Sequence, residues 1–221
     1  MGVIMNKVTE ILIQQGYADR FVRTAQLDRL ITGSPARRYS LVHRAMKSGE
    51  LVRLQRGLYV LADRFRSAPC HPFATAQALA PTSYVSFETA LAYHGWIPER
   101  VFTVASAIPG RKSRQYQHEQ LGSYSFHPLA VQPGCFLELV DRVEGGGWHA
   151  LVARPCRALM DLVCLRKFSW KGLDWLLQGL RIDWEFLSSI TEEEIRTLHR
   201  VYKHKRVKGF LAGLYRELKH D

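Results

Sequence analysis

The 221-residue sequence lacks the segments that would direct a protein into or across a membrane. It has no run of about 18 apolar residues, so no transmembrane helix is expected. Its first ten residues, MGVIMNKVTE, do not show the charged and then apolar pattern of a signal peptide. We therefore expect a cytoplasmic protein.

The spacings typical of a metal or phosphate site are also missing. The four cysteines form no CxxC pair and the nine histidines form no HxxxH unit, which argues against structural zinc. The run Gly145–Gly147 is not a phosphate-binding loop, because the lysine and the helix of that motif do not follow. We expect no metal, no cofactor, and reduced thiols at Cys70, Cys135, Cys156 and Cys164.

No catalytic set stands out either. Ser86 fits the N-cap of a short helix, Glu88 suits the first helical turn, and His94 suits the helix end. Asp161 lies among apolar residues near Arg157 and Arg166, where an ion pair is the simplest interpretation. We therefore expect a protein that is not an enzyme and has no catalytic residues.

A metal-dependent nuclease is the one enzyme class kept as a hypothesis. Such folds use two acidic residues and a nearby lysine, and the best candidates are Glu138 and Asp141. No lysine stands at a suitable spacing from them, which weakens this hypothesis. A GS pair followed by DxD, which a nucleotidyltransferase requires, is also missing.

Positive charge is abundant and unevenly distributed. The net charge is +11, with 12 Lys or Arg against 5 Asp or Glu in residues 1–68. Residues 196–221 hold 8 basic and 2 acidic residues, so the middle of the chain is nearly neutral. Two basic blocks around a neutral centre indicate a polyanionic partner, of which nucleic acid is the usual one.

The most informative segment is residues 34–60, SPARRYSLVHRAMKSGELVRLQRGLYV. Ser34 and Pro35 suit a helix start, Gly49 suits its end, and two short β-rich runs follow. On a helical wheel Tyr39, Val42, Ala45 and Met46 share one face, with Arg38 toward it. Arg37, Ser40, Arg44 and Lys47 share the opposite face, with Leu41 toward it. Such a basic face is what a major-groove reader needs, although a solvated surface helix also has one.

The preceding residues complete a helix-turn-helix pattern. We expect a helix at Val8–Gln15, an extended piece at Phe21–Arg23, and a second helix at Ala25–Ile31 with Thr24 as its N-cap. With the basic helix and its hairpin, this is the order of a winged helix-turn-helix domain. Arg53 and Arg56 then lie on the wing, within reach of phosphate or minor groove.

A change of composition near Asp63–Pro72 marks the expected domain boundary. We therefore predict a winged helix-turn-helix domain over residues 1–66 and an α+β domain over 67–221. The second is expected to hold a small antiparallel sheet and terminal helices. Its expected strands are Val101–Ala107, Gln115–His118, Ser123–His127, Phe136–Val140 and Trp148–Ala153. Its later helices are expected after Pro155 and at Leu173–Leu180, Trp184–Tyr202 and Lys208–Lys219.

Three segments resemble the AbiEi-type antitoxins of bacterial type IV toxin–antitoxin, or abortive infection, modules. They are GELVRLQRGLYV at the predicted wing, SYVSFETALAYHGWIPERVFTVAS after the boundary, and ARPCRALMDLVCLR further on. The resemblance extends from about residue 5 to about residue 170. The last 50 residues match only in being helical and basic.

The resemblance implies an autorepressor that binds inverted repeats in its own promoter as double-stranded DNA. It also implies an antitoxin domain that opposes a nucleotidyltransferase-like toxin, without safely implying a direct contact with that toxin. The implied DNA contacts are Arg37, Arg38, Ser40, Arg44, Lys47, Arg53 and Arg56. No antitoxin residue can be carried over from the family.

One alternative function is kept open from the residues themselves. The basic C-terminal block fits a non-specific nucleic-acid binder, RNA included, that shields the target of the toxin. The surface that would serve either this role or the antitoxin activity comprises Arg200, Lys203, Lys205, Arg206 and Lys208.

Overall fold

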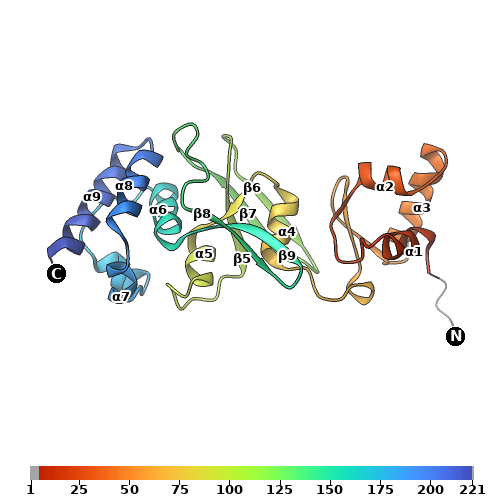
Figure 1. Cartoon of the computed structure of the whole chain (residues 1–221), viewed down its shortest axis with the longest axis horizontal. Coiled ribbons are helices and arrows are strands. Elements are labelled where there is room, and N and C mark those ends of the chain that lie inside the picture. Colours follow the sequence, from red (N-terminus) through yellow and green to blue (C-terminus); the bar gives the residue numbers. More distant parts are fainter. Residues whose placement is uncertain (1–4, 221) are drawn as a thin grey trace. The chain divides into compact units, whose positions relative to one another are not determined.

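The computed structural model describes residues 5–220, except for the side chain of His220, and is of the α+β class (Figure 1). The chain divides into two compact units, Met1–His71 and Pro72–Asp221. The predicted assignment of a DNA-binding domain to 1–66 and an antitoxin domain to 67–221 stays a prediction. No helix in the described part of the chain is long and apolar enough to cross a membrane.

The N-terminal unit has its elements in the order that the sequence predicts. They are α1 (Lys7–Gln14), β1 (Val22–Arg23), α2 (Thr24–Leu30), α3 (Pro35–Lys47), β2 (Leu51–Gln55) and β3 (Leu58–Leu61), followed by a 3₁₀ turn, η1 (Asp63–Phe65). The strands form an antiparallel sheet in the order β1-β3-β2. The three helices and this sheet enclose a small core of Val8, Leu12, Val22, Leu27, Ile31, Ala45, Leu51 and Leu61.

Local signals explain most element ends in this unit. The Ser34 hydroxyl accepts a hydrogen bond from the Arg37 amide at 3.3 Å, and Pro35 is the first residue of α3. Gly49, with a φ of +66°, follows the end of α3 and lets the chain turn into β2. The prediction for Thr24 was wrong: it is the first residue of α2, and Gln26 Oε1 accepts from the preceding Arg23 amide at 2.8 Å.

The second unit is built on a six-stranded sheet in the order β6-β7-β5-β4-β9-β8. Its strands are β4 (Tyr84–Val85), β5 (Thr103–Ile108), β6 (Arg114–His118), β7 (Gly122–Pro128), β8 (Val140–Gly145) and β9 (Trp148–Ala153). The predicted small antiparallel sheet is wrong, because β5–β7 and β4–β9 pair in parallel and make the sheet mixed. Strand β7 inserts between β5 and β6 instead of continuing a meander, and local sequence does not encode that order.

Two helices of this unit, α4 (Pro72–Leu79) and α5 (Phe87–Tyr93), lie beside the sheet, and the later helices gather at one end of the unit (Figure 1). These later helices are α6 (Pro155–Arg166), α7 (Trp184–Ser188), α8 (Glu192–Val201) and α9 (Lys205–His220), with a π-helical turn, η2 (Trp175–Gly179). Helix α4 is tied to β9, because the Leu151 amide donates to Gln77 Oε1 at 2.7 Å. Helix α6 is the centre of the unit, since every residue from Cys156 to Cys164 is buried.

Three predicted elements of this unit were wrong. Phe136–Val140 is mostly a turn, and the strand begins at Val140. The single helix expected at Trp184–Tyr202 is two helices, because Thr191 caps a new helix and exchanges hydrogen bonds with Glu194. The helix expected at Leu173–Leu180 is reduced to the π-helical turn η2.

Candidate nucleic-acid interface

Helix α3 presents a row of polar and cationic side chains to solvent. Arg37, Ser40, Arg44 and Lys47 are all exposed, as the helical wheel predicts. The opposite side of the helix packs into the core through buried Ala45 and half-buried Leu41, Val42 and Met46. Burial thus fixes the helix by one face and leaves the four polar side chains free to meet a ligand.

Two assignments on this helix were wrong. Tyr39 was expected on the buried face but is 72% exposed, and Leu41 was expected toward the polar face but packs on the core. The packing positions are 38, 41, 42, 45 and 46, which is the regular spacing of one helical face. The buried face of α3 in the structure is rotated from the apolar face of the helical wheel by less than one residue position. This rotation accounts for both errors.

Arg38 differs from the other predicted DNA contacts because it is already engaged within the unit. Its Nε donates to Asp28 Oδ1 at 2.9 Å and its Nη1 donates to the Gly33 carbonyl at 2.6 Å. Asp28 belongs to α2, so this ion pair holds α3 at a fixed position against α2. The guanidinium retains other N–H groups for a ligand, and its DNA contact stays a prediction.

Two further side chains on the exposed face were missed by sequence reasoning. The rings of Tyr39 and His43 lie stacked, with centroids 6.1 Å apart and an interplanar angle of 23°. Both residues are exposed beside Ser40 and Arg44. Their i, i+4 spacing was the signal that could have identified them. They add an aromatic surface to the row.

The hairpin of β2 and β3 carries the other predicted contacts. Arg53 and Arg56 are both exposed. Gly57 at the turn has a φ of +79°, and its carbonyl accepts from the Thr24 amide at 3.0 Å. A Cβ at Gly57 would lie 3.3 Å from Thr24 Oγ1, so a glycine allows this close contact. The hairpin is therefore fixed to the start of α2.

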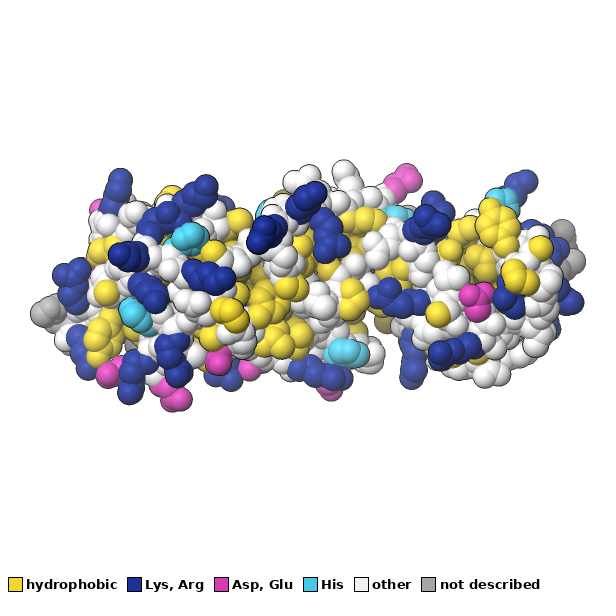
Figure 2. All heavy atoms as spheres, turned by 90° about the horizontal axis from the view of Figure 1, so that it is seen from above, with side chains coloured by type: hydrophobic (Ala, Val, Ile, Leu, Met, Phe, Trp, Pro, Cys, Tyr) yellow, Lys and Arg dark blue, Asp and Glu magenta, His cyan; other side chains and the backbone are white. Residues whose placement is uncertain are grey.

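The predicted C-terminal surface lies on α8, on α9 and on the turn between them. Arg200, Lys203 and Lys205 are exposed, whereas Arg206 and Lys208 are half-buried. Figure 2 shows many Lys and Arg side chains over this part of the second unit, at the left end of the view, with few acidic ones among them. The structure thus gathers these five residues on one continuous stretch of helix, turn and helix.

Residues 13–62 match a protein-family model described as "Transcriptional regulator, AbiEi antitoxin". Over these residues the chain is similar to the AbiEi antitoxin transcriptional regulators. The AbiEi-type segment runs from the end of α1 through β3 and so contains α3 and the hairpin. This match confirms the resemblance that the wing motif indicated. No curated protein matches the chain at a significant level.

The fold of the chain is similar to a solved structure, "Crystal structure of RV2827C protein from Mycobacterium tuberculosis". The two are 15% identical in sequence, with a TM-score of 0.54. The similarity covers 95% of this chain and 78% of the other. At this identity the similarity describes the fold alone.

Outside the AbiEi-type segment, the second unit contains a buried ion pair between Arg157 and Asp161. Arg157 Nε lies 2.9 Å from Asp161 Oδ1, and both side chains are fully buried, as the sequence indicated for an ion pair. The hydroxyls of Tyr84 and Ser86 donate to Asp161 Oδ2 at 2.9 and 2.7 Å, and Tyr202 donates to Oδ1 at 2.6 Å. Arg157 also donates to Tyr84 and to the Glu138 carbonyl.

This network explains the electrostatics of the site. Burial and the Asp161 charge raise the pKa values of Tyr84 and Tyr202 well above their ordinary range, so both stay protonated donors. Burial alone would lower the pKa of Arg157, but Asp161 keeps it raised and the guanidinium charged. Every acceptor site of Asp161 named above is filled by a donor, so the carboxylate acts as a structural centre.

The residues that resemble a catalytic set have structural partners. Ser86 lies at the N-cap position, but its hydroxyl bonds to Asp161 and not to α5, which corrects the prediction. His94 Nε2 lies 2.9 Å from the Ala153 carbonyl and not from a carbonyl of its own helix. Asp141, a candidate of the nuclease hypothesis, forms a two-point ion pair with Arg154 at 2.8 and 3.0 Å.

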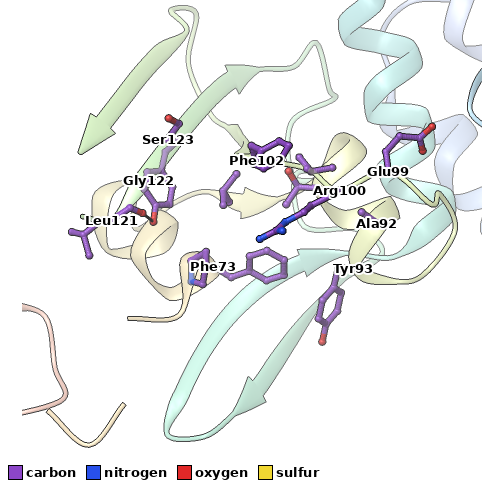
Figure 3. Close-up of a pocket in the computed structure, with 14 residues that line it drawn as sticks. Phe73, Ala92, Tyr93, Glu99, Arg100, Phe102, Leu121, Gly122 and Ser123 are labelled. Atoms are coloured by element: carbon purple, nitrogen blue, oxygen red, sulfur yellow. Dashed lines mark hydrogen bonds between the residues drawn. The ribbon is translucent and has the colours of Figure 1, made fainter. Parts of the chain in front are cut away.

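A shallow pocket of about 500 Å³ opens beside the loop that follows α5 (Figure 3). Arg100 extends into it between Phe73 and Phe102, and Phe102 is 80% exposed. Glu99, at the edge, is paired with Arg181. None of the residues that the sequence predicted to bind nucleic acid lines this pocket.

Proposed function

We propose that the N-terminal unit is a winged helix-turn-helix domain that binds duplex DNA, with α3 in the major groove and the β2–β3 hairpin as the wing. The observation that carries this proposal is the clean division of α3. Arg37, Ser40, Arg44 and Lys47 are exposed on one face, while Leu41, Val42, Ala45 and Met46 pack on the other. The AbiEi-type match over residues 13–62 supports it independently.

The exposed groups suit the two parts of DNA recognition. Arg37 and Arg44 are the residues able to pair bidentately with guanine O6 and N7, which supplies sequence choice. Ser40 and Lys47 suit phosphate or sugar contacts, which set position without reading sequence. Arg53 and Arg56 on the hairpin suit a phosphate or an adjacent minor groove. Arg38 contributes through its bracing of α3 on Asp28 and through its remaining N–H groups.

In this proposal the chain represses its own promoter at inverted repeats. It also acts in the cytoplasm as the antitoxin of a type IV module whose toxin resembles a nucleotidyltransferase. The second unit carries the antitoxin activity, by binding and not by catalysis, and the proposal requires no stable complex with the toxin. It rests on the AbiEi-type match and on the resemblance of the segments at residues 83–106 and 153–166.

The test is fluorescence anisotropy of the full chain on its own upstream DNA and on a scrambled duplex, at two salt concentrations. Specific binding exceeds non-specific binding by about 10³-fold or more at physiological salt. We expect that preference for the upstream duplex. Equal and steeply salt-dependent binding to both duplexes would refute the autorepressor and favour the non-specific nucleic-acid binder.

A matched pair of variants locates the interface. Combined alanine substitution of Arg37, Arg44 and Lys47 should weaken upstream binding by about 1–3 kcal/mol for each base-specific arginine. Combined substitution of Arg111, Lys112 and Arg114, an exposed basic cluster in the second unit, removes the same charge. It should leave the preference for upstream DNA unchanged. Equal losses in the two variants would mean that net charge, and not α3, carries the binding.

A further inference from the structure

A pocket of about 640 Å³ in the second unit has an aromatic lining and a basic rim. It lies between the segment at residues 167–175 and helix α9. Its aromatic residues are Phe168 and Trp175, both half-buried, and Phe210, which is buried. Lys167, Lys171 and Asp174 are exposed at its edge, and Ser169 and Gly172 complete it.

The three rings form one packed aromatic cluster at the pocket. Phe168 and Trp175 pack directly against each other, with centroids 4.3 Å apart at an angle of 45°. The buried Phe210 lies edge-on to Trp175, at 6.0 Å and 86°. Because the first two rings are only half-buried, each retains accessible surface for stacking.

The backbone around the pocket is held in an unusual conformation. Trp170 packs against α9 so closely that a Cβ at Gly213 would lie 2.4 Å from its ring. Trp175 stands at the start of the π-helical turn η2, and a Cβ at Gly179 would lie 2.9 Å from its indole. π-Helical turns occur often at functional sites. These contacts fix the pocket before any ligand arrives.

The charge near the pocket is positive. Lys167 and Lys171 outnumber Asp174 at the rim. Arg206 precedes Phe210 on α9 by one helical turn, about 6 Å. Arg206 belongs to the basic surface of Arg200, Lys203, Lys205 and Lys208 described above. An aromatic pocket at the end of a basic surface is the arrangement that proteins use to stack a base and track its phosphates.

We propose that this pocket takes one unstacked base of a single-stranded RNA, while the basic surface of α8 and α9 contacts the adjoining phosphates. Asp174 can accept a hydrogen bond from an exocyclic amino group of the base. This inference concerns the second unit and does not rest on the operator binding proposed for α3. It gives the basic C-terminal surface a ligand of stated chemistry.

Single-stranded RNA fits the pocket better than a duplex does. In a duplex the bases are stacked and paired, so their faces cannot enter a concave aromatic site. The loops and ends of RNA present splayed bases that stack on Phe, Tyr and Trp side chains. The phosphates of a duplex could contact the basic surface, but none of its bases could enter the pocket.

The test is fluorescence anisotropy of the full chain with a labelled 12-nucleotide RNA of mixed, non-self-complementary sequence. The same sequence as single-stranded DNA and as duplex RNA forms the other two arms. We expect the single-stranded RNA to bind tightest and Trp175→Ala to weaken it about 5- to 150-fold. Trp175→Phe, which keeps a stacking ring, should recover most of the affinity.

Matched variants separate stacking from charge and from folding. Phe102→Ala removes an aromatic side chain that lies elsewhere in the same unit and is 80% exposed. This variant should leave the affinity for the single-stranded RNA unchanged. The Lys167→Ala/Lys171→Ala double variant alters only exposed side chains, and should lower both the affinity and its salt dependence. The alanine variant of Arg37, Arg44 and Lys47 should bind this RNA like the wild type, even where operator binding is lost.

Three results would overturn the inference. One is the absence of binding to single-stranded RNA, and another is equal binding of duplex and single strand. The third is wild-type affinity in both the Trp175→Ala and the double lysine variants. Tighter binding of the single-stranded DNA arm would overturn the choice of RNA.

Discussion

Replacing Asp161 by asparagine should strongly destabilise the second unit while keeping the shape of the side chain. In the wild-type chain Asp161 accepts hydrogen bonds from Arg157, Tyr84, Ser86 and Tyr202 at 2.6 to 2.9 Å. The amide that replaces one carboxylate oxygen is a donor. Hydroxyl groups can rotate to accept from it, but the Arg157 guanidinium cannot accept and loses its counter-charge.

The size of the effect follows from the burial of both partners. Arg157 and Asp161 have fully buried side chains, so the arginine charge left behind has no water to replace the carboxylate. Removing one partner of such a pair costs about 3–5 kcal/mol. For a unit of 150 residues or so each kcal/mol lowers the melting temperature by about 2–4 °C, which gives a fall of about 6–20 °C.

Tryptophan fluorescence during urea or thermal unfolding is the suitable assay. All five tryptophans, at positions 96, 148, 170, 175 and 184, belong to the second unit, so the signal reports that unit alone. The matched control is Asp141→Asn, which makes the same change in an exposed pair with Arg154. Exposed ion pairs contribute about 0–1 kcal/mol, so the free energy of unfolding of the control variant should stay close to that of the wild type.

A loss below about 1 kcal/mol for Asp161→Asn, or a loss equal to that of Asp141→Asn, would refute this reasoning. It would mean that the buried arginine finds compensation from Tyr84 and the carbonyls around it. A fully retained preference for upstream DNA is expected at temperatures where the second unit stays folded, because α3 belongs to the other unit.

Glu50→Gln should destabilise the N-terminal unit by about 2–3 kcal/mol, because the buried carboxylate accepts from Asn6 at 3.0 and 2.6 Å. Burial alone would raise the pKa of Glu50, but hydrogen bonds hold the pKa below the ordinary 4.5. The ionised carboxylate therefore stabilises the folded state at pH values above 4.5. The contribution is lost as the pH falls through the folded-state pKa, and the variant should remove that acid dependence in far-ultraviolet circular dichroism. Gly213→Ala should cost about 1–3 kcal/mol by displacing Trp170, whereas Gly209→Ala, with open space on the same helix, should stabilise by about 0.5–1 kcal/mol. Equal denaturation midpoints for the two glycine variants would contradict the close packing at Trp170.

The sequence predicted the N-terminal unit well because its signals are local. Ser34, Pro35 and Gly49 mark the ends of α3, and the spacing of its apolar residues marks its buried face. The wheel still misplaced Tyr39, since a rotation of the packed face by less than one residue moves a borderline position. Which basic side chains of α3 are engaged within the unit was not predictable in the same way, because the ion pair of Arg38 depends on Asp28 in another helix.

The second unit was predicted less well because its order is set by distant contacts. The parallel pairing of Val85 with Val152 joins strands that are 67 residues apart, and nothing local signals it. The aromatic pocket was missed for the same reason: Phe210 and Trp175 meet only through the fold. The break before α8 was visible in the sequence, as the capping pattern Thr191-x-x-Glu194, and was overlooked.

The first turns of α3, α8 and α9 differ in the sign of their charged side chains. The charges of α8 stabilise its helix dipole, whereas those of α3 and α9 suit an anionic ligand. Helix α8 begins with three glutamates at 192–194 and ends with His199 and Arg200, which suits the helix dipole at both ends. Helices α3 and α9 have no acidic residue in the first turn and begin with arginines or lysines instead. A cation there opposes the dipole at a cost of about 0.3–1 kcal/mol. Within residues 5–220, Arg37 and Lys205 have no carboxylate within 4.0 Å to relieve that cost. A phosphate beside either helix start satisfies both the side chains and the dipole, which is why we assign nucleic acid to these two helix starts and not to the acidic start of α8.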